Sequence, residues 1–323
     1  MCTFGSSRLG VAGKGADIDT LCIVPKHIER HRHFFDKLVP ILEATPGVKD
    51  LTAVKEAFVP LVKMTFDNVD IDLLFACVQA KKVDKEPNLL DNNILRGCAA
   101  DDIKSLNGCR VTDKINELVA AAGPKSIHNF QTTLKCVKLW AKNRGVYSNV
   151  LGYPGGVAWA LLVAKICINH PKLEPNQLLP RFFQYYLDYN WSYDNPVTLE
   201  EPIQNDPNII GFQLPDDGKL FYKQMHQHKM PIITPAFPAQ NATHNISEST
   251  KKVILTELEK ASLITKALVE TPDDDKLSWA RLFKKFPFFK AFEHFIEVQI
   301  LSKTEADHGK WGGFCQSKIK NLL

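Results

Sequence analysis

The stretch FGSSRLGVAGKGADIDT (residues 4–20) joins a glycine-rich loop to two aspartates that flank a single isoleucine. Four glycines precede Asp17, and residues 18–24 form a short apolar run rich in residues that favour strands. Because residues i and i+2 of a strand point to the same face, Asp17 and Asp19 are predicted to project together. Two such carboxylates repel each other unless a cation lies between them.

The loop ahead of these aspartates predicts a phosphate site. Gly5-Ser6 can open a turn whose backbone N–H groups and hydroxyl hold phosphate oxygens. Magnesium prefers hard oxygen ligands and commonly joins one or two carboxylates to substrate phosphates. The alternative is that the Asp-x-Asp pair lies by chance in a surface loop, and a third carboxylate distinguishes the two interpretations.

A predicted hairpin supplies that third carboxylate. Two apolar runs, 61–66 and 69–75, are separated only by Asp67-Asn68, whose residue types tolerate positive φ. The second run carries Asp70 and Asp72 on one face, and charges inside an apolar run are costly to bury without a partner. Asp72 lies deeper in the strand, so beside the first two aspartates it would complete a two-metal site.

Composition bounds the remaining possibilities. The chain has 323 residues, enough for two or three domains, and is 45% hydrophobic and 24% charged, which is typical of globular proteins. The formal net charge of +4 permits a nucleic-acid partner without arguing for one. Eight cysteines without Cys-x-x-Cys spacing are interpreted as reduced core residues. The longest apolar run, 157–164, is too short to span a bilayer, so we expect a soluble intracellular protein with no membrane partner.

From residue 89 to 196 the pattern is helical. An apolar stripe with helical spacing precedes Gly145, which lies just past the expected helix end, and residues 157–168 are apolar nearly all round, which predicts a buried helix. The stripe consists of Phe130, Leu134, Val137 and Ala141. Residues 196–245 are rich in Pro, Asn and Asp and are predicted to form loops and short elements.

The last part of the chain begins near Ser249 with a helix-like segment from residue 251. Residues 292–301 are a strand candidate, and residues 303–323 a final helical piece. The segment RLFKKFPFFK (residues 281–290) interleaves basic and aromatic residues, a pattern also found in platforms that stack single-stranded nucleic acid. We interpret its phenylalanines around Pro287 as packing residues instead.

Several stretches together resemble one family, the eukaryotic nuclear poly(A) polymerases of the polymerase-β-like nucleotidyltransferase superfamily. Gly5-Ser6, ten residues, Asp17-x-Asp19 and a later strand aspartate match the superfamily signature. The match runs in order through almost the whole chain and is densest in the first 170 residues. It is carried by FGSSRLGVAGKGADIDTLCIVP, EAFVPLVKMTFDNVDIDLLFA, SLNGCRVTD, KLWAKNRGVYSNVLGYPGGVAWALLVA and MPIITPAFPAQNATHNIS.

The resemblance implies an α+β fold in three parts. These are a nucleotidyltransferase palm with a mixed sheet and helices (1–80), a helical central domain (81–248) and a partial RRM-like α+β RNA-binding domain (249–323). It also implies that the chain is shortened at both ends, since only three residues precede Phe4. We therefore expect residues 4–6 to be poorly anchored.

The implied activity is template-independent polyadenylation. The family is a transferase that adds AMP from ATP to mRNA 3′ ends by in-line attack on the α-phosphate, with release of pyrophosphate. Two Mg²⁺ ions, for which Mn²⁺ can substitute, stabilise the attacking and leaving oxygens. The resemblance also implies a nuclear location and partners among the cleavage and polyadenylation proteins.

Site residues are carried over by position. Asp17 and Asp19 would bind both metal ions, and Asp72 would hold the ion that activates the RNA 3′-hydroxyl. Gly13 need not be glycine, so its backbone is the expected contact. The implied ATP-binding residues are Phe4, Gly5, Ser6, Gly13, Asp17, Ile18, Asp19, Asp72, Asn107, Lys138, Tyr147, Gly156 and Val157.

Each of the later residues also has an ordinary structural interpretation. Lys138 shares a helical face with Lys135 and Lys142, and such rows are usually solvated; we assign the triphosphate contact to Lys138 and leave the other two solvated. Tyr147 could be a buried aromatic residue with a satisfied hydroxyl. Asn107 precedes a glycine, which first of all predicts a turn, and the glycine pair that ends at residue 156 is likewise a turn signal.

Two other functions compete with polyadenylation. One is a nucleotidyltransferase with another nucleotide preference, such as uridine, although the stretches SLNGCRVTD and MPIITPAFP favour the poly(A) type. The other is an RNA-binding or scaffold protein that is catalytically inactive because its ends are missing. Replacing Asp72 with alanine distinguishes them, since it should abolish tailing and leave RNA binding largely intact.

Overall fold

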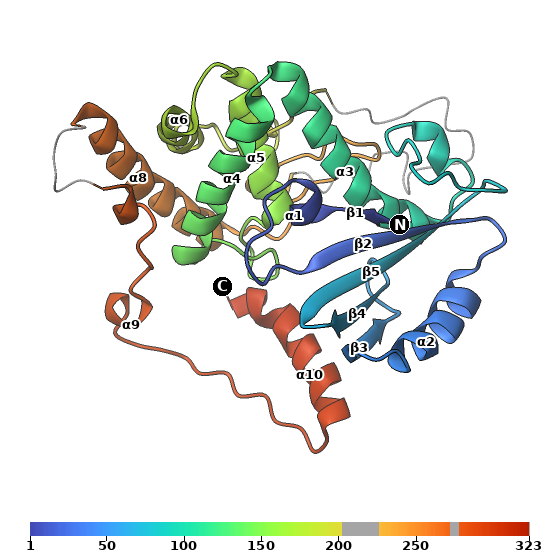
Figure 1. Cartoon of the computed structure of the whole chain (residues 1–323). Helices are drawn as coiled ribbons and strands as arrows, with labels where there is room; N and C mark the ends of the chain where they lie inside the picture. The colour runs from blue at the N-terminus through green and yellow to red at the C-terminus, as the bar shows by residue number, and fades with distance from the viewer. Residues whose placement is uncertain (202–225, 272–277, 323) are drawn as a thin grey trace. The chain divides into compact units, whose positions relative to one another are not determined.

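The computed structural model describes residues 1–201, 226–271 and 278–322 (Figure 1). The chain divides into two compact units. The described parts of the first are residues 1–131, 198–201 and 233–240, and those of the second are residues 132–197, 226–232, 241–271 and 278–322. Part of the predicted loop region 196–245 lies outside the described residues. No helix in the described ranges is long and apolar enough to cross a membrane.

The first unit is built on a mixed five-stranded sheet with the strand order β1-β2-β5-β4-β3. Strands β2 and β5 pair in parallel, and the other neighbours pair antiparallel. The strands are β1 (Cys2–Thr3), β2 (Ile18–Pro25), β3 (Val48–Val54), β4 (Leu61–Phe66) and β5 (Val69–Val78). This confirms the predicted mixed sheet.

Helices cover both faces of this sheet (Figure 1). Alternate residues of β5 enter two different hydrophobic clusters because successive strand side chains point to opposite faces. Leu74, Ala76 and Val78 pack with residues of α3 (Ala100–Ala122), whereas Leu73 and Phe75 pack with residues of η1 (Arg30–Leu38) and α2 (Val39–Glu43). Asp72 precedes Leu74 by two residues and therefore lies on the face that α3 covers.

The predicted hairpin is confirmed. Strands β4 and β5 are joined by Asp67 and Asn68, whose φ angles are 47° and 65°. Two consecutive positive φ angles match the twist of the flanking strands, which is why Asp and Asn are favoured there.

The loop around Phe4 is well anchored, so the expectation of poor anchoring is wrong. The Phe4 amide donates to the Asp19 carbonyl at 3.0 Å and so extends the β1–β2 pairing by one bond. The Gly5 amide, at the start of α1 (Gly5–Arg8), donates to Thr112 Oγ1 at 3.3 Å. The Phe4 ring lies against Gly108, where an added Cβ would be 2.9 Å from the ring. Helix α3 therefore supplies the support expected from a longer strand.

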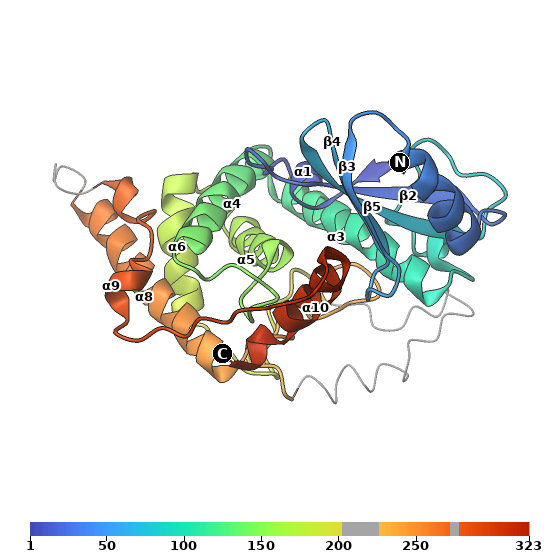
Figure 2. The same ribbon diagram turned by 90° about the horizontal axis from the view of Figure 1, so that it is seen from below.

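The second unit is helical, as predicted (Figure 2). Its helices include α5 (Gly156–Asn169), α6 (Pro175–Leu187) and α8 (Glu248–Glu270), and α4 (Ser126–Asn143) enters it from the first unit. The expected buried helix is α5, with residues 158–164 buried. An edge-to-face aromatic core joins Trp140 of α4 to Trp159 of α5 and Phe183 of α6. Helix α8 packs against α6.

The remaining helical segments are short or near the C-terminus. They are η2 (Asn92–Leu95), η3 (Trp279–Arg281), α9 (Phe288–Ala291), α10 (Glu305–Lys318) and η4 (Ile319–Leu322). The predicted final helical piece is thus confirmed. The predicted strand at 292–301 is wrong, because this segment pairs with no other strand in the described part of the chain, and a strand needs a partner for its hydrogen bonds. The packing interpretation of the phenylalanines fails for Phe289, which is 82% exposed.

Candidate active site

Two of the three predicted aspartates are direct neighbours across the sheet. The parallel pairing of β2 with β5 aligns Asp19 with Asp72, and Ile18 with Ile71. Asp17 immediately precedes β2 and is exposed. Because aligned residues of adjacent strands share a face, Asp19 and Asp72 both lie on the α3 side of the sheet. The sheet therefore fixes the positions of Asp19 and Asp72, whereas Asp17 lies at the end of the preceding loop.

Asp19 lies where its negative charge is unfavourable. Burial, followed by the negative charges of Asp17 and Asp72, raises the pKa of Asp19 to about 6, and Lys63 partly offsets this effect. A carboxyl group whose pKa is raised by burial and by neighbouring carboxylates is typical of a site that works with a cation.

The donor set fits a hard divalent cation, although it is not gathered around one point. Among the residues that the structure describes, no three histidine, cysteine or carboxylate side chains are placed so that they could hold a metal ion. The three aspartates nevertheless offer the oxygen ligands that Mg²⁺ prefers. A divalent cation would also relieve the repulsion that raises the pKa of Asp19.

Gly5 allows the loop to approach Asp19 closely. Its φ is +62°, and a Cβ built on it would lie 2.3 Å from Asp19 Oδ2. Any other residue would therefore be strained and would displace the carboxylate. Ser6 follows in α1, and its carbonyl accepts from the Val11 amide at 2.9 Å. In contrast, a Cβ at Gly13 would meet nothing within 4 Å, so the space at this position does not require glycine.

Asn107 lies inside α3, so the prediction of a turn at this position is wrong. The helix overrides the turn signal because the residues around Asn107 pack on the sheet. Its side chain is buried, with 9% exposed, and its Oδ1 atom has no hydrogen-bond partner in the described structure. A buried amide oxygen without a partner is costly and calls for a ligand or water.

In the second unit the structure brings Tyr147 and Gly156 together. A Cβ built on Gly156, the first residue of α5, would lie 2.8 Å from the Tyr147 hydroxyl. Val157 follows with 41% of its surface exposed, so α5 is less fully buried at its start than the sequence predicts. Lys138 is half-buried on α4.

Lys142 is exposed, as expected for a solvated lysine, and its ammonium also lies 5.2 Å from the centre of the Tyr147 ring. Such a cation–π contact orients the ring beside the start of α5. The lysine row alone gave no reason to select it. The sequence feature that indicates this contact is a lysine near the end of α4 followed by an aromatic residue five positions later.

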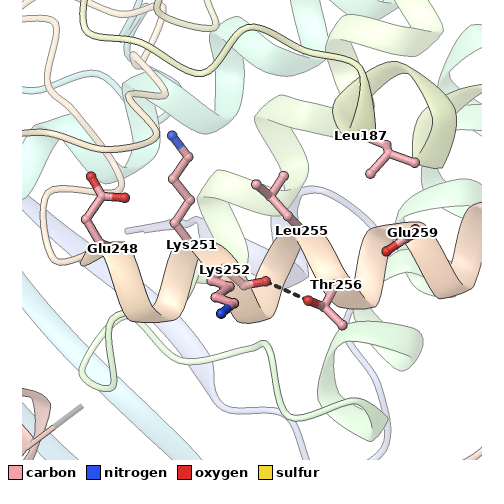
Figure 3. Close-up of a pocket in the computed structure, with 7 residues that line it drawn as sticks. All are labelled: Leu187, Glu248, Lys251, Lys252, Leu255, Thr256 and Glu259. Carbon is pink, nitrogen blue, oxygen red and sulfur yellow. Dashed lines mark hydrogen bonds between the residues drawn. The ribbon is translucent and has the colours of Figure 1, made fainter.

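The predicted site residues therefore form two groups. Phe4, Gly5, Ser6, Gly13, Asp17, Ile18, Asp19, Asp72 and Asn107 belong to the first unit, whereas Lys138, Tyr147, Gly156 and Val157 belong to the second. A separate pocket of about 280 Å³ lies along α8 (Figure 3). It is lined by Leu187 and α8 residues, and it contains no predicted site residue.

Solved structures share this fold. A structure of the Cid1 poly(U) polymerase superposes with a TM-score of 0.55 and 15% identity, over 88% of this chain and 85% of that chain. A structure of a cytoplasmic RNA terminal U-transferase gives a TM-score of 0.53 and 17% identity, over 88% and 85% of the two chains. The chain thus has a nucleotidyltransferase fold.

Family models identify the particular family. The poly(A) polymerase nucleotidyltransferase domain matches residues 1–119, the central domain residues 129–285, and the predicted RNA binding domain residues 287–323. The chain belongs to the poly(A) polymerase family. The domain limits predicted at 80/81 and 248/249 stay predictions.

Curated relatives agree with this family. The chain is 41% identical to nuclear poly(A) polymerase 1 of Arabidopsis thaliana over 320 residues. The aligned region covers 99% of this chain and 43% of the relative. It is 41% identical over 322 residues to poly(A) polymerase PAPalpha of Candida albicans, covering 99% of this chain and 55% of the relative. The chain thus spans about half the length of the curated relatives it matches.

Proposed function

We propose that this chain is a polynucleotide adenylyltransferase that adds AMP from ATP to the 3′ end of mRNA. The observation that carries the proposal is the alignment of Asp19 with Asp72 across β2 and β5, with Asp17 at the end of the adjoining loop. Asp19 and Asp72 thus offer hard oxygen donors on one face of the sheet. The loop that contains Gly5 lies directly against Asp19.

Asp17 and Asp19 would hold two Mg²⁺ ions, and Asp72 would hold the ion nearest the RNA 3′-hydroxyl. Bound divalent cations supply charge neutralisation at the attacking and leaving oxygens. The RNA 3′-hydroxyl loses its proton to solvent as its oxygen attacks the α-phosphorus of ATP in line, the bond from that phosphorus to the bridging oxygen breaks, and pyrophosphate leaves with the electron pair of that bond. Phe4 and Gly5 would line the phosphates, and Ser6 would contact them through its amide and hydroxyl, because the Phe4 and Gly5 amides already donate to the Asp19 carbonyl and to Thr112 Oγ1.

The other nucleotide contacts are proposed from the second group and from α3. Lys138 would pair with the triphosphate, and Tyr147 would contact the nucleotide beside the start of α5. The buried Asn107 Oδ1 would accept a hydrogen bond, such as that of an adenine amino group. Gly13, Ile18 and the α5 residues Gly156 and Val157 would complete the ATP contacts, chiefly through their backbones.

The nuclear poly(A) polymerase among the relatives supports a nuclear location. Proteins that select RNA 3′ ends for cleavage and polyadenylation are the proposed partners. Residues 287–323, which match the predicted RNA binding domain model, are proposed to contact RNA, and the domain limits predicted from the sequence are proposed to separate the catalytic, central and RNA-binding parts.

A primer-extension assay tests the proposal. The chain is incubated with an oligo(A) primer, Mg²⁺ or Mn²⁺, and each of the four nucleoside triphosphates separately. We expect extension with ATP alone and its loss in Asp72→Asn, with primer binding retained. Extension with UTP instead would assign another nucleotide preference. Primer binding without extension by any nucleotide would make this chain an RNA-binding relative and would overturn the proposal.

A further inference from the structure

Asp72 is already occupied by a cation that belongs to the chain. Lys63 Nζ lies 2.8 Å from Asp72 Oδ2 and 3.2 Å from Oδ1, so it donates to both carboxylate oxygens. The antiparallel pairing of β4 with β5 aligns the two residues directly, which makes this contact a property of the strand register. Asp72 retains 21% of its side-chain exposure and Lys63 retains 55%.

The two registers together place three charged residues in one row across the sheet. Asp19 on β2 is opposite Asp72 on β5, and Asp72 is opposite Lys63 on β4. All three lie on the face that α3 covers, since aligned residues share a face. The lysine ends a row whose other two members are proposed metal ligands.

We propose that Lys63 is a positioning residue that holds Asp72 in the absence of metal and competes with the divalent cation for its oxygens. This inference rests on the proposed function. An ammonium and a hard cation use the same lone pairs of a carboxylate, so Asp72 cannot serve both fully at once. Cation binding then includes release of Asp72 by Lys63, whose exposed end can move into solvent.

This competition predicts two effects of opposite sign when the lysine is removed. In Lys63→Met, Asp72 is free for the metal and the site gains one unit of negative charge, so a divalent cation should bind more tightly. Without metal, the same variant leaves Asp19 and Asp72 uncompensated, so the protein should unfold at a lower temperature. A lysine that merely supported the sheet would lower stability without tightening metal binding.

The test is a titration of the full chain with Mn²⁺ alone, followed by electron paramagnetic resonance of the free ion, together with thermal unfolding in chelator. We expect Lys63→Met to lower the Mn²⁺ Kd about three- to fivefold, the upper part of the range expected for a partly exposed ion pair. Lys63→Arg, which can also pair with both oxygens, should restore the wild-type Kd within about twofold. The control is Lys49→Met, an exposed lysine on β3 opposite Thr65, which should change neither quantity.

The outcomes separate the two proposals. An unchanged or higher Kd in Lys63→Met, with wild-type binding that is lost in Asp19→Asn, overturns the role of Lys63 alone. Wild-type protein that binds no Mn²⁺ sensitive to Asp19→Asn overturns both the metal site of the proposed function and the role of Lys63.

Discussion

At the residue scale, Asp19 is held where its charge is unfavourable. Its pKa is raised to about 6 from the ordinary value of 3.8, first by burial and then by the negative charges of Asp17 and Asp72. The folded state therefore binds the proton more tightly than the unfolded state does. The contribution of this group to stability is fully present below pH 3.8 and is lost as the pH rises to about 6.

Asp19→Asn should accordingly raise the stability of the metal-free protein at pH 7.5 while it abolishes extension. The amide cannot ionise, so the loss of stability between about pH 4 and 6 should become smaller in the variant. Thermal unfolding in chelator at several pH values measures this. Asp84→Asn, at an exposed position, is the control and should leave the stability at pH 7.5 within about 0.5 kcal/mol of the wild-type value. Equal or lower stability of Asp19→Asn at pH 7.5 would contradict the electrostatic account.

Two glycines of the loop differ in whether their positions could accept a side chain. Gly5→Ala places a Cβ against Asp19 Oδ2 at a φ of +62°, so we expect a loss of about 1–3 kcal/mol of stability and at least roughly a hundredfold of the extension rate. Gly13→Ala meets open space, and stability should change by less than about 0.5 kcal/mol with extension largely kept. Denaturant unfolding and primer extension of both variants test this. Similar effects of the two substitutions would show that the loop is not fitted to Asp19.

The arrangement of the strand aspartates could largely be predicted from the sequence, because successive side chains of a strand point to opposite faces. The alternation that puts Asp72 on one face of its strand is visible in the sequence, and the register then aligns it with Asp19. Lys63 could not be predicted, since its role depends on which residue the hairpin places opposite Asp72. The burial of Asn107 depends on helix packing, which overrode a local turn signal.

At the element scale, predictions held where the local sequence decides the structure. The β4–β5 hairpin follows from a two-residue turn with positive φ, and α5 from a long apolar run. The segment 292–301 carries strand-forming residues, yet strand propensity without a neighbouring strand leaves its hydrogen bonds unmade. Sequence alone cannot show whether such a neighbour exists.

A buried ion pair of the second unit links α8 to the residue that follows α4. Arg144, which follows α4, contacts Glu257 of α8 at 2.5 Å, and Lys260 contacts the same carboxylate at 2.9 Å. Glu257 is almost fully buried, so Glu257→Ala leaves a guanidinium without its carboxylate and should cost about 3 kcal/mol of stability. The exposed Glu259→Ala on the same helix should cost less than about 0.5 kcal/mol.

Urea unfolding, with hydrogen exchange of α4 and α8, measures this difference. Faster exchange confined to these two helices in Glu257→Ala would agree with its role as a link between them. A variant as stable as Glu259→Ala would show that the packing of α8 on α6 alone holds the helix in place.

At the scale of the whole molecule, the family follows from motifs spread over nearly the entire chain, and the three family models cover the same span. Asp17, Asp19 and Asp72 belong to the first unit, whereas Lys138 and Tyr147 belong to the second. The predicted site residues are therefore divided between two compact units. Only the family resemblance, and no local sequence pattern, predicts that they share one site.

The central claim is that Asp17, Asp19 and Asp72 form the metal site of nucleotidyl transfer. The most direct test is anomalous X-ray diffraction from crystals of this chain soaked with Mn²⁺ and a non-hydrolysable ATP analogue. We predict anomalous peaks bounded by these three carboxylates and the analogue's phosphates, with Lys63 released from Asp72. Manganese bound elsewhere, or the analogue bound with the Lys63–Asp72 pair intact and no peak beside Asp19, would contradict the account.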